Sequence, residues 1–167
     1  IDGSGGALVA NIGHGHSEIF QKMMEQMGKV GYVHGTQFTT RSIEEYAEAL
    51  GGILPEGLEK IYFLSGGSES VEAAIKFARQ YFLDSGQSQR WRVVAGWHSY
   101  HGNTLGALSL TGRIGIRKPY LPLLIDFPHF SPPYCYRCPF SLCYPQCGLE
   151  CAKALERVIQ MEGPETI

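Results

Sequence analysis

The stretch SGGSESVE at residues 65–72 decides how this part of the chain folds. It follows a short β-like run at residues 60–64, and after it apolar side chains recur every three or four positions from Val71 to Phe82. That spacing is typical of one apolar face of a helix, which we place at residues 68–83. The sequence therefore predicts a strand, a turn of small residues and a helix in direct succession.

The small-residue turn has the chemistry of an anion site. N–H groups in the first turn of a helix have no intrahelical partner, and the helix dipole places partial positive charge there. We expect Ser68 to cap the helix, and the two glycines let the backbone approach a ligand closely. No Lys follows the glycines and no G-x-G-x-x-G is present, which argues against both nucleotide-binding motifs. Alone, such a turn is more often an ordinary connection than a ligand site.

Strand and helix patterns alternate after residue 58. The predicted elements are strands at 60–64, 92–96 and 121–127 and helices at 68–83 and 102–110. This alternation is typical of βαβ units in an α/β fold, with a mainly parallel sheet flanked by helices. Ligands of such sheets bind at the carboxyl ends of the strands, where the 65–72 turn and Tyr100 both fall.

A second stretch, VVAGWHSYHGNTLGA at residues 93–107, ends a predicted strand with an aromatic residue, a histidine and a glycine. Together with NIGHGH at residues 11–16 and YVHGTQFTT at residues 32–40, the two stretches resemble the class III aminotransferases. These enzymes use pyridoxal 5'-phosphate and have the aspartate-aminotransferase fold, fold type I. Each motif alone is weak, but their order and separation are specific, and the resemblance covers essentially the whole chain.

The resemblance implies a set of cofactor-binding residues. Gly67 and Ser68 match the positions whose backbone and hydroxyl hold the cofactor phosphate, and Tyr100 matches the aromatic residue that stacks on the pyridine ring. His101 is implied to support the ring face. The full set is Gly66, Gly67, Ser68, Tyr100, His101 and Gly102. Without the resemblance, a half-buried core aromatic would be the better interpretation of Tyr100.

The resemblance also divides the chain. Residues 1–57 correspond to an N-terminal segment with two helices, which belongs to the small domain and the dimer contacts. Residues 58–167 correspond to the first part of the cofactor-binding large domain, including a Cys- and Pro-rich loop at 131–151. Ser17 and Ser42 are the expected caps of the two N-terminal helices.

The chain begins without Met and stops just after a predicted helix, so we expect it to be the N-terminal portion of a longer enzyme. In the family, a lysine forms a Schiff base with the cofactor and an acidic residue pairs with the pyridine nitrogen. None of the lysines present matches the lysine motif, and we expect both residues downstream. This segment alone is expected to be inactive.

The resemblance implies an amino acid or amine as donor, a 2-oxo acid as acceptor, and a homodimer with a shared active site. Tyr32, His34 and Phe38 are candidates to line a substrate pocket between the subunits. An equally good interpretation is that they are loop aromatics and a surface histidine. A decarboxylase or an aminomutase of the same fold is an alternative that the sequence does not separate from a transaminase.

The composition excludes several classes of function. The chain has 167 residues, 44% of them hydrophobic and 18% charged, with a formal net charge of −2. This length can bury a substantial core, and the charge balance offers no basic surface for nucleic acid or an anionic membrane. No segment has the roughly twenty apolar residues that span a bilayer, and the N-terminus lacks the pattern of a secretion signal. We expect a cytoplasmic protein that acts on small molecules.

The five cysteines all fall within the 131–151 loop: Cys135, Cys138, Cys143, Cys147 and Cys151. The first four have a spacing that could hold zinc or an iron–sulfur cluster, which would make the chain a non-catalytic metal-binding module. Disulfides are a further alternative. Free packed thiols are favoured, because a Pro- and aromatic-rich insertion of this kind resembles one branch of the same family and disulfides are disfavoured in the cytosol. A truncated, inactive relative that serves as a partner subunit is a third reading.

Overall fold

The computed structural model describes residues 2–167. The chain divides into two compact units, Ile1–Tyr62 and Phe63–Ile167. The sequence placed the start of the large domain at residue 58, close to this division. The assignment of the two units to parts of a larger enzyme stays a prediction.

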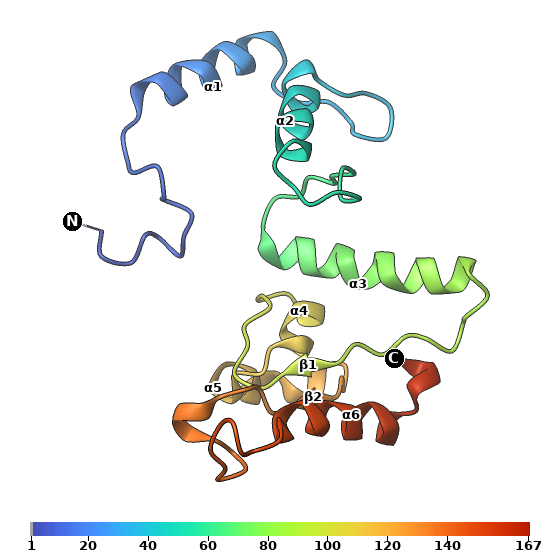
Figure 1. The fold of residues 1–167 in the computed structure, drawn as a ribbon. Coiled ribbons are helices and arrows are strands. Elements are labelled where there is room, and N and C mark those ends of the chain that lie inside the picture. The colour runs from blue at the N-terminus through green and yellow to red at the C-terminus, as the bar shows by residue number, and fades with distance from the viewer. Residues whose placement is uncertain (1) are drawn as a thin grey trace. The chain divides into compact units, whose positions relative to one another are not determined.

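The first unit contains two helices joined by a loop, α1 (Ser17–Lys29) and α2 (Arg41–Gly51) (Figure 1). The predicted caps are wrong by one or two residues. The α1 helix begins after His16, and α2 begins after Thr40, whose side chain accepts a hydrogen bond from the Ile43 N–H at 3.3 Å. Ser42 lies inside α2, where its hydroxyl donates to Gln26 of α1 at 2.9 Å and so links the two helices.

The second unit begins with the longest helix, α3 (Gly67–Asp84), and then forms a series of short elements (Figure 1). These are β1 (Ala95–Gly96), α4 (Leu105–Leu110), α5 (Ile114–Arg117), η1 (Lys118–Leu123), β2 (His129–Phe130), η2 (Cys135–Arg137), α6 (Glu150–Glu162) and η3 (Pro164–Thr166). The strands β1 and β2 are parallel, with Ala95 opposite His129 and Gly96 opposite Phe130. The predicted α/β class with a parallel sheet is confirmed, although the sheet is small and most of the ordered chain is helical.

Several predicted elements differ from those observed. Residues 60–64 form no strand, because a strand needs a partner strand and the sheet in the described part of the chain consists of β1 and β2. Residues 121–127 were predicted as a strand, but η1 occupies the chain to Leu123 and contains Pro122, which cannot donate to a ladder. The helix predicted from residue 102 starts at Leu105, since Gly102 has a φ of 141° that a helix does not allow.

The core of the second unit lies where the sheet meets α3 and α4. Its buried residues are Ala95, Leu110 and Phe127, and Val71 and Ile75 from the apolar face of α3 pack against them together with Val93. The α4 helix is buried from Ala107 to Leu110. The first turn of α3 is therefore anchored by the packing of the turns that follow it.

A close backbone approach shapes the turn that follows β1. The His98 N–H donates to the Gly112 carbonyl and the Gly112 N–H donates to the Ser99 carbonyl, both at 3.0 Å. A Cβ at Gly112 would collide with the Gly96 carbonyl oxygen and lie 2.6 Å from the Trp97 Cα. Only glycine permits this contact. The contact fixes the path of the backbone that leads from β1 to Tyr100.

Candidate functional site

The first turn of α3 presents backbone N–H groups without a side-chain cap. Its N-cap residue is Gly66, in an extended conformation, and no described side chain caps the helix. The prediction that Ser68 caps α3 is wrong, because Ser68 lies within the helix. The Ser70 hydroxyl instead donates to the Gly66 carbonyl at 2.9 Å. The N–H groups of this turn are the kind of donors that bind an anion.

Ser68 joins this helix start to the turn after Tyr100. Its hydroxyl oxygen accepts the Asn103 N–H at 2.9 Å, which leaves the hydroxyl hydrogen available for another acceptor. Gly102 is buried, and a Cβ there would lie 2.7 Å from the Ser68 Oγ and 2.8 Å from the Ala107 Cβ. The structure thus brings together Ser68 and Gly102, two residues that the sequence singled out.

Tyr100 lies on the same turn with more than half of its surface open. Its side chain is 54% exposed, and the Arg113 guanidinium carbon lies 5.6 Å from its ring centroid. The His101 N–H donates to the Thr111 hydroxyl at 3.0 Å, and Thr111 is fully buried. The backbone beside Tyr100 is therefore anchored, while its ring remains accessible to a ligand.

Glu72 is a site residue that the sequence reasoning missed. Its carboxylate accepts the Gly106 N–H at 2.8 Å and the Ala107 N–H at 3.2 Å. The pKa of Glu72 is lowered mainly by the nearby Thr104 hydroxyl, and less by these N–H groups and Lys76, while partial burial opposes them. The Thr104 hydroxyl does not have hydrogen-bond geometry toward any described residue, so the two N–H groups are the hydrogen bonds that hold this carboxylate. In the sequence, Glu72 stands four residues before Lys76, a spacing that indicates only an ion pair along the helix. The available signal was the spacing of four from Ser68, which puts both side chains on one face of α3.

One negative group lies beside the helix start. A Cβ at Gly66 would be 2.9 Å from a carboxylate oxygen of Glu69, a residue exposed in the first turn. An anion bound at this turn requires that flexible side chain to swing away. The site therefore combines backbone N–H donors that attract an anion with one movable carboxylate, Glu69, that repels it.

An aromatic and basic cluster lies at the end of β1, with Arg117 buried and Trp97 and His129 half-buried. Trp97 and His129 stack with centroids 4.5 Å apart, and a guanidinium nitrogen of Arg117 lies 3.1 Å from the His129 Nε2. Burial is the main cause that lowers the pKa of His129, and the positive charge of Arg117 lowers it further. The His129 Nδ1 lies 2.8 Å from the Phe127 carbonyl oxygen and its Nε2 lies 3.0 Å from the Leu110 carbonyl oxygen, so the ring links β2 to the end of α4.

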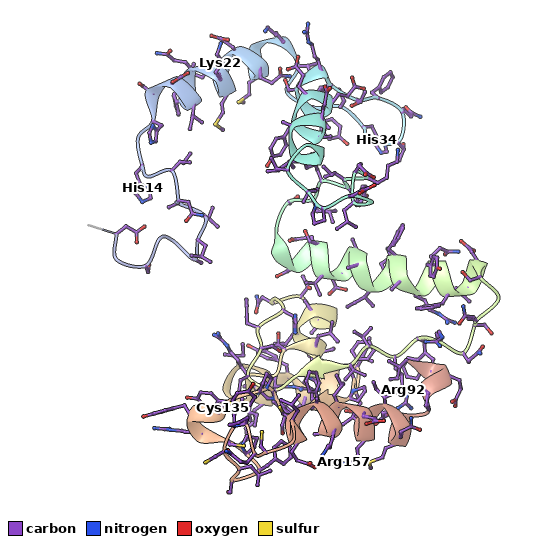
Figure 2. All side chains as sticks on the ribbon, in the orientation of Figure 1. His14, Lys22, His34, Arg92, Cys135 and Arg157 are labelled. Carbon is purple, nitrogen blue, oxygen red and sulfur yellow. The ribbon has the colours of Figure 1, made fainter. Side chains whose placement is uncertain are left out.

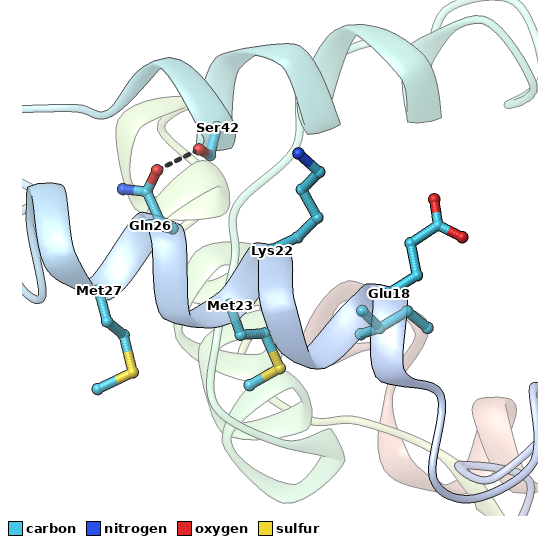
Figure 3. Close-up of a pocket in the computed structure, with 7 residues that line it drawn as sticks. Glu18, Lys22, Met23, Gln26, Met27 and Ser42 are labelled. Atoms are coloured by element: carbon cyan, nitrogen blue, oxygen red, sulfur yellow. Dashed lines mark hydrogen bonds between the residues drawn. The ribbon is translucent and has the colours of Figure 1, made fainter.

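The three residues proposed for a substrate pocket lie in the first unit. Tyr32 is 80% exposed, Phe38 is 64% exposed, and the His34 Nδ1 lies 2.8 Å from the Thr36 hydroxyl (Figure 2 labels His34). The first unit has a hollow of about 530 Å³ between α1 and α2 (Figure 3). It is lined by Glu18, Ile19, Lys22, Met23, Gln26, Met27 and Ser42, and by none of these three residues. Their role in substrate binding stays a prediction.

The five cysteines are free thiols. Four of them line one small cavity of about 20 Å³: Cys135, Cys138, Cys147 and Cys151 (Figure 2 labels Cys135). Among residues 2–167, no three His, Cys, Asp or Glu side chains are grouped as a metal ion requires. The arrangement gives the metal-binding alternative no support.

None of the helices formed by residues 2–167 has the length and apolar character needed to cross a bilayer.

Comparison with known proteins gives a consistent result. The sequence matches the family model described as aminotransferase class-III over residues 1–166. An uncharacterized aminotransferase of Bacillus subtilis, YodT, is 39% identical over 82% of this chain and 31% of its own length. The crystal structure of an (S)-enantioselective omega-transaminase from Thermomicrobium roseum superposes with a TM-score of 0.91 at 37% identity, over 100% of this chain and 38% of that one.

A second solved structure, an amine transaminase from an uncultivated Pseudomonas species in its PLP-bound form, has a TM-score of 0.89 at 31% identity. It covers 100% of this chain and 38% of that one. The chain spans about a third of the length of the curated relatives it matches. The predicted fold type I is confirmed by these likenesses.

Proposed function

Because this chain belongs to the class III aminotransferase family, we propose that the complete polypeptide that carries it is a pyridoxal-phosphate-dependent aminotransferase. The reaction moves an amino group from an amino acid or amine to a 2-oxo acid. The observation that carries the proposal is the packing of Gly102 and Asn103 on Ser68 at the uncapped start of α3. This packing makes one compact surface of backbone and hydroxyl donors.

The residues of this surface fit the cofactor's phosphate. The N–H groups of Gly67 and Ser68 and the free hydrogen of the Ser68 hydroxyl are donors for phosphate oxygens, with Gly66 flanking them. A helix start carries roughly half a positive charge, so a dianion is held there without a nearby cationic side chain. Glu69 moves aside when the phosphate binds, because its carboxylate would otherwise lie beside the same donors.

Tyr100 orients the cofactor ring. Its aromatic side chain is accessible for stacking, and the hydrogen bond from the His101 N–H to Thr111 holds the backbone that carries it. His101 and Gly102 complete this support, Gly102 by allowing the turn to touch α3. When bound, pyridoxal phosphate supplies the electron sink that allows a bond at the substrate's amino-bearing carbon to break.

Further parts of the active site lie outside residues 2–167 in this proposal. The six lysines of the chain are Lys22, Lys29, Lys60, Lys76, Lys118 and Lys153. None matches the family's lysine motif, so we place the lysine that binds the cofactor and moves protons downstream. A homodimer with a shared site, in which Tyr32, His34 and Phe38 line the substrate pocket, and a cytosolic location complete the proposal.

The names of the similar proteins guide the choice of donor. The two solved structures are those of an omega-transaminase and an amine transaminase, which favours testing primary amines as well as amino acids. The acceptor we propose is a 2-oxo acid such as pyruvate. Its keto group stands at the carbon where the corresponding amino acid carries its amino group, so it can take up the amino group of the donor.

The test uses the complete polypeptide, purified and titrated with pyridoxal phosphate. We expect a visible absorption band from the bound cofactor, loss of that band when a primary amine is added, and conversion of added pyruvate to alanine. A protein that stays colourless at saturating cofactor would overturn the proposal. Bound cofactor with release of CO2 from an amino acid, and no alanine, would instead assign a decarboxylase of the same fold.

A further inference from the structure

Two side chains on one face of α3 hold both ends of a single short segment. Ser68 and Glu72 are four residues apart, so both project from the same side of the helix. The Ser68 hydroxyl accepts the Asn103 N–H, and the Glu72 carboxylate accepts the N–H groups of Gly106 and Ala107. The segment 103–107 is therefore fastened to the first two turns of α3 by three hydrogen bonds.

The carboxylate of Glu72 caps α4 from outside. Thr104 is the N-cap residue of α4, but its side chain makes no cap hydrogen bond to the helix. Glu72 supplies this cap from another helix, with its negative charge at the positive end of α4. A charge-assisted hydrogen bond is stronger than a neutral one, so an ionised carboxylate holds this helix start more strongly than an amide would.

Gly106 is part of the same arrangement. A Cβ at this position would collide with one Glu72 carboxylate oxygen and lie 2.7 Å from the other. Gly102 has the matching relation to Ser68, where a Cβ would lie 2.7 Å from the Oγ. Each of the two α3 side chains therefore lies against a glycine, Ser68 against Gly102 and Glu72 against Gly106.

We infer that Glu72 is a positioning residue for the cofactor phosphate site. By holding the start of α4, it keeps Gly102 and Asn103 against Ser68 and so directs the free hydroxyl hydrogen of Ser68 toward the phosphate. Glu72 itself contacts no cofactor atom. This inference rests on the proposed function, since it concerns the same site.

The experiment measures the affinity of the complete polypeptide for pyridoxal phosphate and for pyridoxal, which lacks the phosphate. We expect Glu72→Gln to raise the Kd for pyridoxal phosphate about tenfold, because the amide loses the charge that strengthens both hydrogen bonds. The Kd for pyridoxal should change less than about twofold. A general loss of structure would raise both constants equally, and that result would overturn the inference.

Two further variants sharpen the test. Asp84→Asn makes the same chemical change at the far end of α3, where the carboxylate accepts a hydrogen bond from Gln80, and should leave both constants unchanged. Gly106→Ala displaces the Glu72 carboxylate without altering it and should reproduce the effect of Glu72→Gln on pyridoxal phosphate. If Gly106→Ala leaves the Kd unchanged, the carboxylate does not act through α4.

A double variant tests the proposed route. If Glu72 acts through Ser68, Glu72→Gln combined with Ser68→Ala should weaken binding by less than the product of the two single effects. Wild-type protein that binds no pyridoxal phosphate would reject the proposed function. If the wild type binds pyridoxal phosphate and Glu72→Gln binds it equally tightly, this inference is rejected and the proposed function is not.

Discussion

The two units of the chain differ in what holds them together. The buried hydrophobic residues of the described chain all lie in the second unit, whereas α1 and α2 of the first unit have none. Met23, Met24 and Met27 of α1 are 58–70% exposed, although a methionine stripe is core filling by default. A unit that packs its own core can hold a binding site rigidly, which places the candidate site in the second unit on physical grounds.

The largest expected effect tests the cores themselves. Leu110→Ala should lower the free energy of unfolding by about 2–4 kcal/mol, because Leu110 packs in the small core with Ala95 and Phe127. Met23→Ala in α1 should cost less than about 0.5 kcal/mol, since its side chain is mostly exposed. Urea unfolding of the 167-residue chain measures both. Equal losses would show that the two units are not different after all.

The second prediction compares one glycine from each unit. Gly102→Ala should weaken pyridoxal phosphate binding by about 100-fold, because the new Cβ would lie 2.7 Å from the Ser68 Oγ and the φ of 141° disfavours alanine. Gly28→Ala in α1 should leave binding unchanged, as its Cβ would meet no atom within 4 Å. Cofactor titration of the complete polypeptide provides the measurement, and tight binding by the Gly102 variant would reject the site.

The third prediction compares two serines that lie near the start of a helix. Ser68→Asp should raise the Kd for pyridoxal phosphate at least about tenfold, because a carboxylate at that position repels the phosphate. Ser42→Asp, in the first turn of α2, removes the hydroxyl that donates to Gln26 and should leave the Kd unchanged. Retention of the cofactor after gel filtration is a simple readout. If the Ser68 variant retains it normally, the phosphate binds elsewhere.

The smallest expected effect is a pH response confined to the second unit. The lowered pKa of His129 means that the unfolded chain binds a proton more readily than the folded chain does. Its contribution to stability is therefore present above about pH 6.5 and is lost as the pH falls through the lower folded-state pKa. His129→Gln should flatten the stability profile below pH 6.5, measured by unfolding followed by tryptophan fluorescence, to which Trp91 and Trp97 of the second unit contribute. An unchanged slope would mean that His129 is not the titrating group.

The sequence predicted what depends on local pattern and motif. The helix placed at 68–83 is observed as Gly67–Asp84, and the family membership inferred from the motifs is confirmed. Strands at 60–64 and 121–127 were wrong because strand formation depends on partners distant in sequence. Glu72 was missed for the same reason, since its partners Gly106 and Ala107 lie 34 and 35 residues away. The cofactor roles of Gly67, Ser68 and Tyr100 remain predictions.

The hydrogen bond between Ser68 and Asn103 also has a consequence for assembly. It joins residues 35 positions apart, so the phosphate surface exists only after that loop has closed, at an entropic cost that grows with the logarithm of its length. A ligand that binds only the closed form stabilises it by a free energy that grows with the logarithm of the ratio of ligand concentration to dissociation constant. Pyridoxal phosphate supplied during synthesis should therefore raise the yield of correctly folded enzyme, and inorganic phosphate should do so more weakly.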